Sequence, residues 1–212
     1  MVSINHEYSV IGHSRATIGR WLGVVAGLLS SLIASLAAGA FALADALGFT
    51  LRGPDPIVIP ATAAIFYFLG HLAFDKWAWR KSLVHKIIGV PDLNGKWDCQ
   101  GTTLDADTRQ VKYQWTASVT ISQSWEKIKV HLNTGQSRSN SVAASIVKQE
   151  GVGFILMYSY RNEPKPGEAE LNAHIGYCEL HISEDMKSAD GMYFNSGGRF
   201  THGKMNLKRG LK

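Results

Sequence analysis

The sequence has little of what most catalytic or disulfide-stabilised proteins need. It contains 2 Cys in 212 residues, too few for the disulfide framework of a small secreted domain, and its 6 Pro and 21 Gly exclude collagen-like or low-complexity chains. It also lacks the Gly-x-Ser-x-Gly, His-Glu-x-x-His, Cys-x-x-Cys and Gly-rich phosphate-loop motifs. We therefore expect a binding protein, not an enzyme, with no metal and no cofactor.

A strong excess of one charge is also missing. The chain carries 22 Lys and Arg against 17 Asp and Glu, a formal net charge of +5. This excess is too small to indicate binding of polymeric nucleic acid. It suits a domain close to anionic membrane lipid, or one that binds a small phosphate ligand.

Long apolar runs, by contrast, are present. Residues 22–44 and 56–74 contain no Lys, Arg, Asp or Glu, and a bilayer is spanned by roughly 20 apolar helical residues. A signal peptide has a shorter apolar core and no second run directly after it. A buried pair of core helices would need a larger α-helical domain than the chain offers. The runs therefore predict a transmembrane hairpin over residues 21–80, with a tight turn at TLRGPDP.

Cations flank the predicted hairpin on the sides of the two termini. They are Arg15, Arg20, Lys76, Arg80, Lys81 and Lys86. Because Lys and Arg concentrate on the cytoplasmic side of a membrane, we expect a two-pass protein with both termini in the cytoplasm. Residues 1–20 are then a cytoplasmic tail and residues 81–92 a linker.

The first predicted membrane helix carries a stripe of small residues. Its members, four apart, are Gly23, Gly27, Ser31, Ser35 and Gly39. Small side chains at this spacing let two helix backbones approach closely, and such packing drives helix association in lipid. The partner is either the second helix of the same hairpin or another copy of the chain.

Residues 93–212 alternate in a period of two, which predicts strands with one buried and one wet face. Turn-forming clusters separate eight such segments, 95–104, 110–122, 126–133, 137–148, 153–162, 171–183, 189–195 and 201–208. Eight antiparallel strands joined by short turns close naturally into a barrel. The Gly-x-Trp of LNGKWDCQG begins the first strand, as in lipocalin-like barrels, where the Trp plugs the closed end. We predict a cytoplasmic, eight-stranded antiparallel barrel.

Polar and aromatic residues that share the buried face of these strands are the candidate ligand contacts. By alternation they are Arg138, Asn140, Tyr158, Tyr160, His174, Arg199 and Thr201. Guanidinium groups, an imidazole, an amide and stacking rings at one barrel mouth suit an anionic ligand with aromatic bases.

The order of the predicted domains resembles a known family. A two-helix hairpin followed by a β-rich domain with LNGKWDCQG and GMYFNSGGRFTHGKMNL is similar to the SMODS-associating two-transmembrane effectors of bacterial CBASS anti-phage systems. The positions in the closing strands that carry the resemblance are Gly191, Tyr193, Arg199 and Gly203. The resemblance implies a bacterial inner-membrane protein whose barrel binds a cyclic dinucleotide made by a neighbouring nucleotidyltransferase. It further implies that binding promotes homo-oligomerisation through the helices and disrupts the membrane, which ends in abortive infection.

Two other functions stay open on the sequence. One is a membrane-anchored, lipocalin-like carrier or chaperone of an apolar ligand, which requires a dry barrel interior. The other is a two-helix structural subunit whose barrel contacts only protein. The polarity of the barrel interior separates the carrier from the nucleotide receptor.

Overall fold

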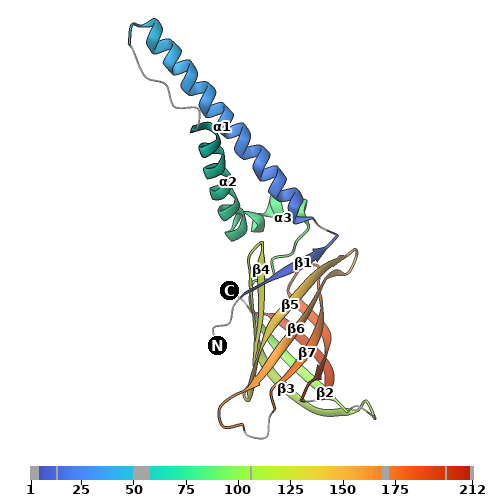
Figure 1. Ribbon diagram of the computed structural model, residues 1–212. Coiled ribbons are helices and arrows are strands. Elements are labelled where there is room, and N and C mark those ends of the chain that lie inside the picture. The colour runs from blue at the N-terminus through green and yellow to red at the C-terminus, as the bar shows by residue number, and fades with distance from the viewer. Residues whose placement is uncertain are drawn as a thin grey trace. The chain divides into compact units, whose positions relative to one another are not determined.

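The computed structural model divides into two compact units, residues 14–79 and residues 1–13 together with 80–212 (Figure 1). It describes residues 5–12, 14–49, 58–105, 107–168, 172–198 and 200–210, without the side chains of residues 58–60, 82, 85 and 86. The turn TLRGPDP, expected between the membrane helices, lies outside these ranges, as does Arg199.

The first unit is built on two apolar helices, α1 (Arg15–Ala46) and α2 (Val58–Lys76). By length and composition α1 can cross a membrane. The two helices pack on each other through α1 residues Ala26 and Ser30, both buried, and the Ser30 and Thr62 hydroxyls lie 2.6 Å apart. A short 3-10 turn, η1 (Ala78–Arg80), follows at the unit boundary, and helix α3 (Ser82–Ile88) already belongs to the second unit.

The second unit is a closed sheet in the strand order β1-β4-β3-β2-β9-β8-β7-β6-β5. All neighbouring strands are antiparallel except β1 and β5, which run parallel along Tyr8–Ile11. The strands are β1 (His6–Ile11), β2 (Gly95–Leu104), β3 (Val111–Gln123), β4 (Lys127–Asn133), β5 (Ser137–Gln149), β6 (Gly153–Pro164), β7 (His174–Ile182), β8 (Ser188–Ser196) and β9 (His202–Arg209). The eight predicted segments correspond to β2–β9, with ends that differ by a few residues.

The ninth strand corrects the prediction of a separate cytoplasmic tail over residues 1–20. Strands β4 and β5 pair only at the His131–Asn133 end and then diverge. Residues His6–Ile11 fill the resulting gap, pairing with β4 on one side and β5 on the other. Tyr8 and Val10 are buried there. Residues 6–11 of the predicted tail are thus part of the sheet, and α1 begins at Arg15 instead of Trp21.

One end of the barrel is plugged by the Trp of the Gly-x-Trp motif. Trp97 is fully buried, its indole N–H donates to the Leu93 carbonyl at 3.2 Å, and the Arg209 guanidinium lies 5.3 Å from its ring centre. Arg209 also donates to the carbonyls of Asp92 and Asn94. The first and last antiparallel strands of the domain are therefore locked together at this closed end.

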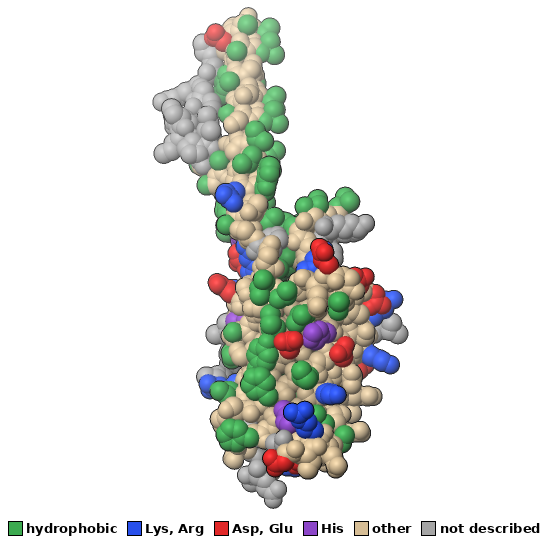
Figure 2. Space-filling model, turned by 90° about the vertical axis from the view of Figure 1, so that its right-hand side faces the viewer, with side chains coloured by type: hydrophobic (Ala, Val, Ile, Leu, Met, Phe, Trp, Pro, Cys, Tyr) green, Lys and Arg blue, Asp and Glu red, His purple; other side chains and the backbone are tan. Residues whose placement is uncertain are grey.

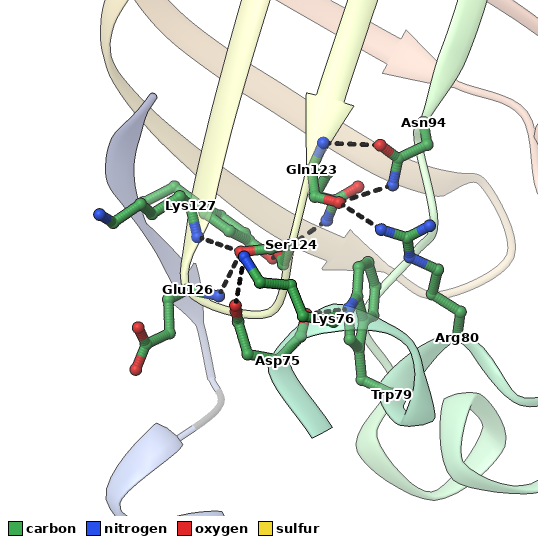
Figure 3. A network of polar contacts seen from close by, with 10 residues as sticks. Asp75, Lys76, Trp79, Arg80, Asn94, Gln123, Ser124, Glu126 and Lys127 are labelled. Carbon is green, nitrogen blue, oxygen red and sulfur yellow. Dashed lines mark hydrogen bonds and ion pairs between the residues drawn. The ribbon is translucent and has the colours of Figure 1, made fainter. Parts of the chain in front are cut away.

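Gln123 holds a second network at the closed end (Figure 3). Its backbone exchanges two hydrogen bonds with the Asn94 side chain, at 2.7 and 2.8 Å, and its carbonyl accepts from Arg80 at 2.9 Å. Its buried carboxamide accepts from the Leu93 N–H and donates to the Tyr8 hydroxyl. One side chain thus connects β1, β3 and the segment that leads into β2.

We predict that Trp97→Ala destabilises the barrel by about 3–5 kcal/mol, the usual cost of emptying a buried Trp site. Thermal unfolding of the full chain in detergent measures the loss. Val111→Ala, at an exposed position of β3, serves as the control and shifts stability by no more than about 0.5 kcal/mol. Equal effects of the two variants would contradict a plug role for Trp97.

Candidate ligand-binding site

The end of the barrel away from Trp97 contains a cavity of about 310 Å³. Strands β2–β9 and the β4–β5 turn, Thr134–Gln136, surround it. Its volume lies at the lower end of the range typical for small-molecule sites. Of the described residues that line it, none is Lys, Arg, Asp or Glu. The cavity is therefore a polar and aromatic site without carboxylate, ammonium or guanidinium groups among these residues.

One wall consists of Trp115 and Tyr193, whose rings meet edge to face with centres 5.8 Å apart. The Trp115 indole N–H donates to the Thr103 hydroxyl at 3.2 Å, and the Tyr193 and Thr103 hydroxyls lie 2.7 Å apart. Neighbouring glycines let the rings lie close to the sheet. A Cβ on Gly101 would stand 2.1 Å from the Trp115 ring, and one on Gly203 would stand 2.8 Å from the Tyr193 ring.

The opposite wall is formed by β6. Tyr158 and Tyr160 lie there with ring centres 5.9 Å apart. The Tyr160 hydroxyl donates to the Asn195 carboxamide at 2.7 Å, and the Asn195 amide donates to the Thr201 hydroxyl at 2.8 Å. This chain of hydrogen bonds fixes the ring and orients polar groups toward the cavity.

The mouth adds further hydrogen-bonding groups. The Asn162 amide donates to the Ser137 hydroxyl at 3.2 Å, and one His174 ring nitrogen lies 3.0 Å from the Asn172 carbonyl. The ammonium of Lys165 donates to the carbonyl of Thr134, in the turn that borders the cavity. Two aromatic walls with hydroxyls and amides between them can stack flat heterocycles and hydrogen-bond their edges.

Comparison with known proteins relates both units to one family. Residues 88–209 match the family described as Cap15, cyclic dinucleotide receptor domain, and residues 16–80 match Cap15, TM helices. The chain belongs to the Cap15 family.

One relative matches nearly the whole chain. It is CD-NTase-associated protein 15 from Yersinia aleksiciae, 37% identical over 206 residues, which are 97% of each chain. The resemblance to CBASS effectors expected from the sequence is confirmed. This Cap15 protein is a membrane-associated CBASS effector with a cyclic dinucleotide receptor domain.

Four of the predicted contact residues line the cavity, namely Tyr158, Tyr160, His174 and Thr201. They come from β6, the start of β7 and the segment just before β9, which the barrel brings together. Arg199 lies outside the described residues. Whether the four residues contact ligand stays a prediction.

The prediction that Arg138 and Asn140 face the barrel interior is wrong. It rested on strict alternation back from Val142, but the β5–β6 pairing shifts register between Ser141 and Ala143. Such a bulge reverses which side chains point inward. Ser139 therefore lines the cavity, Val142 is exposed, and Asn140 lies 2.9 Å from the His131 ring nitrogen.

Sequence reasoning did not place the Trp115–Tyr193 wall among the residues that line the cavity. Trp115 stands on the apolar face of the second predicted segment, and Tyr193 is one of the positions that carry the family resemblance. Both had a signal, therefore, but alternation marks a buried ring as core unless one knows that the barrel is hollow at that level. Asn195 and Ser139 carried no such signal.

Toward the Trp97 end, beyond the aromatic walls, the barrel interior contains both cysteines as free, buried thiols. Burial raises the pKa of Cys99 to about 12, with the nearby Cys178 adding to the effect, and burial likewise raises the pKa of Cys178 to about 12. The Cys178 thiol also lies 3.8 Å from the Met205 sulfur. These thiols are packing groups.

We predict that neither thiol reacts with a maleimide at pH 8 in the folded protein, because both remain protonated and buried. Both become reactive in denaturant, as mass spectrometry of the labelled chain will show.

The sign of the pKa shift also predicts an alkaline limit to the stability of the folded protein. The stability gained from the neutral thiols is fully present below pH 9 and is lost as pH rises toward about 12. Rapid native labelling at pH 8 would contradict this account.

Proposed function

We propose that the cavity at the open end of the barrel is the cyclic dinucleotide site of this Cap15 protein. The observation that supports it best is the pair of aromatic walls, Trp115–Tyr193 from β3 and β8 and Tyr158–Tyr160 from β6. A cyclic dinucleotide presents two bases on one ring of sugars and phosphates. Each wall offers a stacking surface for one base.

The phosphates require donors near the middle of such a ligand. Hydroxyls and amides at Ser137, Ser139, Asn162 and Thr201 border the cavity, and Lys165 places an ammonium beside its mouth. Hydrogen bonds to an ionised acceptor are stronger than neutral ones. The same polar lining disfavours the carrier of an apolar ligand, since that function needs a dry interior.

We further propose that ligand binding leads to oligomerisation through the transmembrane helices and to disruption of the bacterial inner membrane. In this scheme the chain crosses the membrane twice with both termini in the cytoplasm. The side of α1 that packs on α2 is marked by Ala26 and Ser30, one position away from the small-residue stripe. The stripe residues Gly23, Ser31, Ser35 and Gly39 are exposed, and among the described residues nothing beyond the adjoining residues and the backbone of α1 itself lies within 4 Å of a Cβ built on Gly23, Gly27 or Gly39. This leaves the stripe available to another copy.

We predict that Trp115→Ala weakens cyclic dinucleotide binding by about 5- to 150-fold, the loss of one base–aromatic contact of about 1–3 kcal/mol. Calorimetry on the full chain in detergent, with a panel of cyclic dinucleotides carrying all base pairings, measures the change. Arg138→Ala is the matched control, since Arg138 lies outside the cavity, and it leaves the Kd unchanged. If no member of the panel binds the unmodified protein, the proposed site is wrong.

We also predict that Gly27→Leu combined with Ser31→Leu abolishes killing of cells in which the nucleotidyltransferase supplies the ligand. Bulky side chains on the stripe prevent close approach of helix backbones, while the barrel still binds ligand. Dye entry into cells reports membrane damage, and calorimetry reports binding. Ala40→Leu, exposed and off the stripe, retains killing. Undiminished killing by the double variant would exclude the stripe as the interface.

A further inference from the structure

The outer surface of the barrel carries an apolar patch where polar side chains were expected. It lies on β6, β7 and β8, the side of the barrel that Figure 2 turns toward the viewer, and hydrophobic side chains form a strip there beside charged ones. Its members are Ile155, Met157, Ile175, Tyr177, Met192 and Phe194. Met192 is 64% exposed and Phe194 53%. By register, Ile175, Tyr177, Phe194 and Met192 adjoin one another on β7 and β8, and exposed apolar surface of this kind marks an interaction site.

The register across three strands gives the patch an ordered charge pattern. One row reads Glu179–Met192–Lys204 from β7 through β8 to β9, and the next reads Tyr177–Phe194–His202. The Tyr177 and Phe194 rings lie 5.4 Å apart. Each row therefore has an apolar residue of β8 in the middle, and the first row has opposite charges at its two ends.

We propose that this face, centred on β8, is a homotypic interface that binds the same face of a second copy of the chain. A two-fold axis parallel to β8, midway between two facing sheets, exchanges β7 with β9 and keeps each row opposite itself. Met192 and Phe194 then meet their own counterparts. Glu179 faces Lys204 of the second copy twice, once on each side of the axis. An isologous interface requires this kind of self-complementarity.

Other arrangements of the same face fit less well. An axis perpendicular to the strands through Met192 places the Asp190 carboxylate over the Phe194 ring, an unfavourable pairing. The axis along β8 places Asp190 opposite Asp190 of the second copy, a like-charge pair that would repel in contact, so the interface ends at the Met192 row. The Glu179 carboxylate lies 3.0 Å from the His181 ring nitrogen, and a carboxylate has acceptor capacity for Lys204 as well.

A second copy suits this patch better than a lipid surface does. Glu179 and Asp190 stand beside the apolar residues, and both carboxylates would be repelled by anionic headgroups. In a homotypic pair, Glu179 is instead matched by an ammonium. The interface extends the proposed oligomerisation from the membrane helices to the receptor domain, and in that respect it rests on the proposed function.

Cysteine cross-linking tests the predicted axis. Met192→Cys and Phe194→Cys are made in the full chain, in nanodiscs, where the two buried native thiols contribute no background. A short bismaleimide is added with and without each member of the cyclic dinucleotide panel. We expect covalent dimers from both variants and none from Val111→Cys, which is 59% exposed on β3. Equal cross-linking at position 111 would overturn the interface.

Charge exchange tests the pairing. Glu179→Lys and Lys204→Glu should each lower the yield of the Met192→Cys cross-link by about tenfold, because like charges then face each other. The double variant E179K/K204E restores the yield. Lys148→Glu, exposed on β5, is the control and leaves it unchanged. Single variants without effect, or a double variant no better than either single one, would overturn the proposal.

Ligand binding, assembly and vesicle flotation separate this proposal from the proposed function. If the unmodified protein assembles with ligand but the cross-links at 192 and 194 are absent, the barrel interface fails alone. If the protein neither binds any panel member nor assembles, both fail. Flotation with anionic vesicles that increases for Glu179→Lys while cross-linking at 192 stays absent would assign the patch to lipid.

Discussion

The closure of one barrel end by Trp97 and Gln123 is the constraint on which the rest of the receptor unit depends. Trp97 fills the interior under the Arg209 guanidinium, and the buried Gln123 carboxamide ties β1 to the chain that enters β2. An unsatisfied polar group at that position would cost about 1–3 kcal/mol, so the buried carboxamide stabilises the closed end only while these hydrogen bonds are made. Once this end is sealed by bulky side chains, the remaining interior volume lies at the other end, where β3, β6 and β8 bring four rings together.

The cavity proposed for the ligand has no Lys, Arg, Asp or Glu among its described lining residues. Hydroxyls and amides are already held in chains, such as Tyr160–Asn195–Thr201. Their directions are therefore fixed before a ligand arrives, which lowers the entropy cost of binding. Neutral donors also avoid the free-energy cost of burying a charge in the protein when no ligand is bound. Recognition by such a site depends on shape and hydrogen-bond geometry more than on net attraction.

Much of the fold was predictable because strand alternation is a local property. The segments from Gly95 onward, the Trp plug and the apolar helix α1 all follow from hydrophobic spacing within a few residues. The errors have a common origin in non-local geometry. The bulge after Ser141 depends on how β5 pairs with β6, and β1 is a strand only because β4 and β5 diverge far along the chain. No pattern within residues 6–11 contains that information.

The sequence by itself determined the two kinds of segment in this protein, an apolar helical segment and an alternating β domain. Side-chain hydrophobicity and the period with which it repeats along the chain are local properties. The sequence also determined four lining residues, Tyr158, Tyr160, His174 and Thr201, whose parity no bulge disturbs. The tertiary structure alone decided that Ser139 and not Arg138 faces the cavity and that Trp115 and Tyr193 together form one of its walls. It also decided that Glu179 and Lys204 flank Met192 on the outer face of the barrel. Each of these depends on register between strands, and register is a property of paired segments.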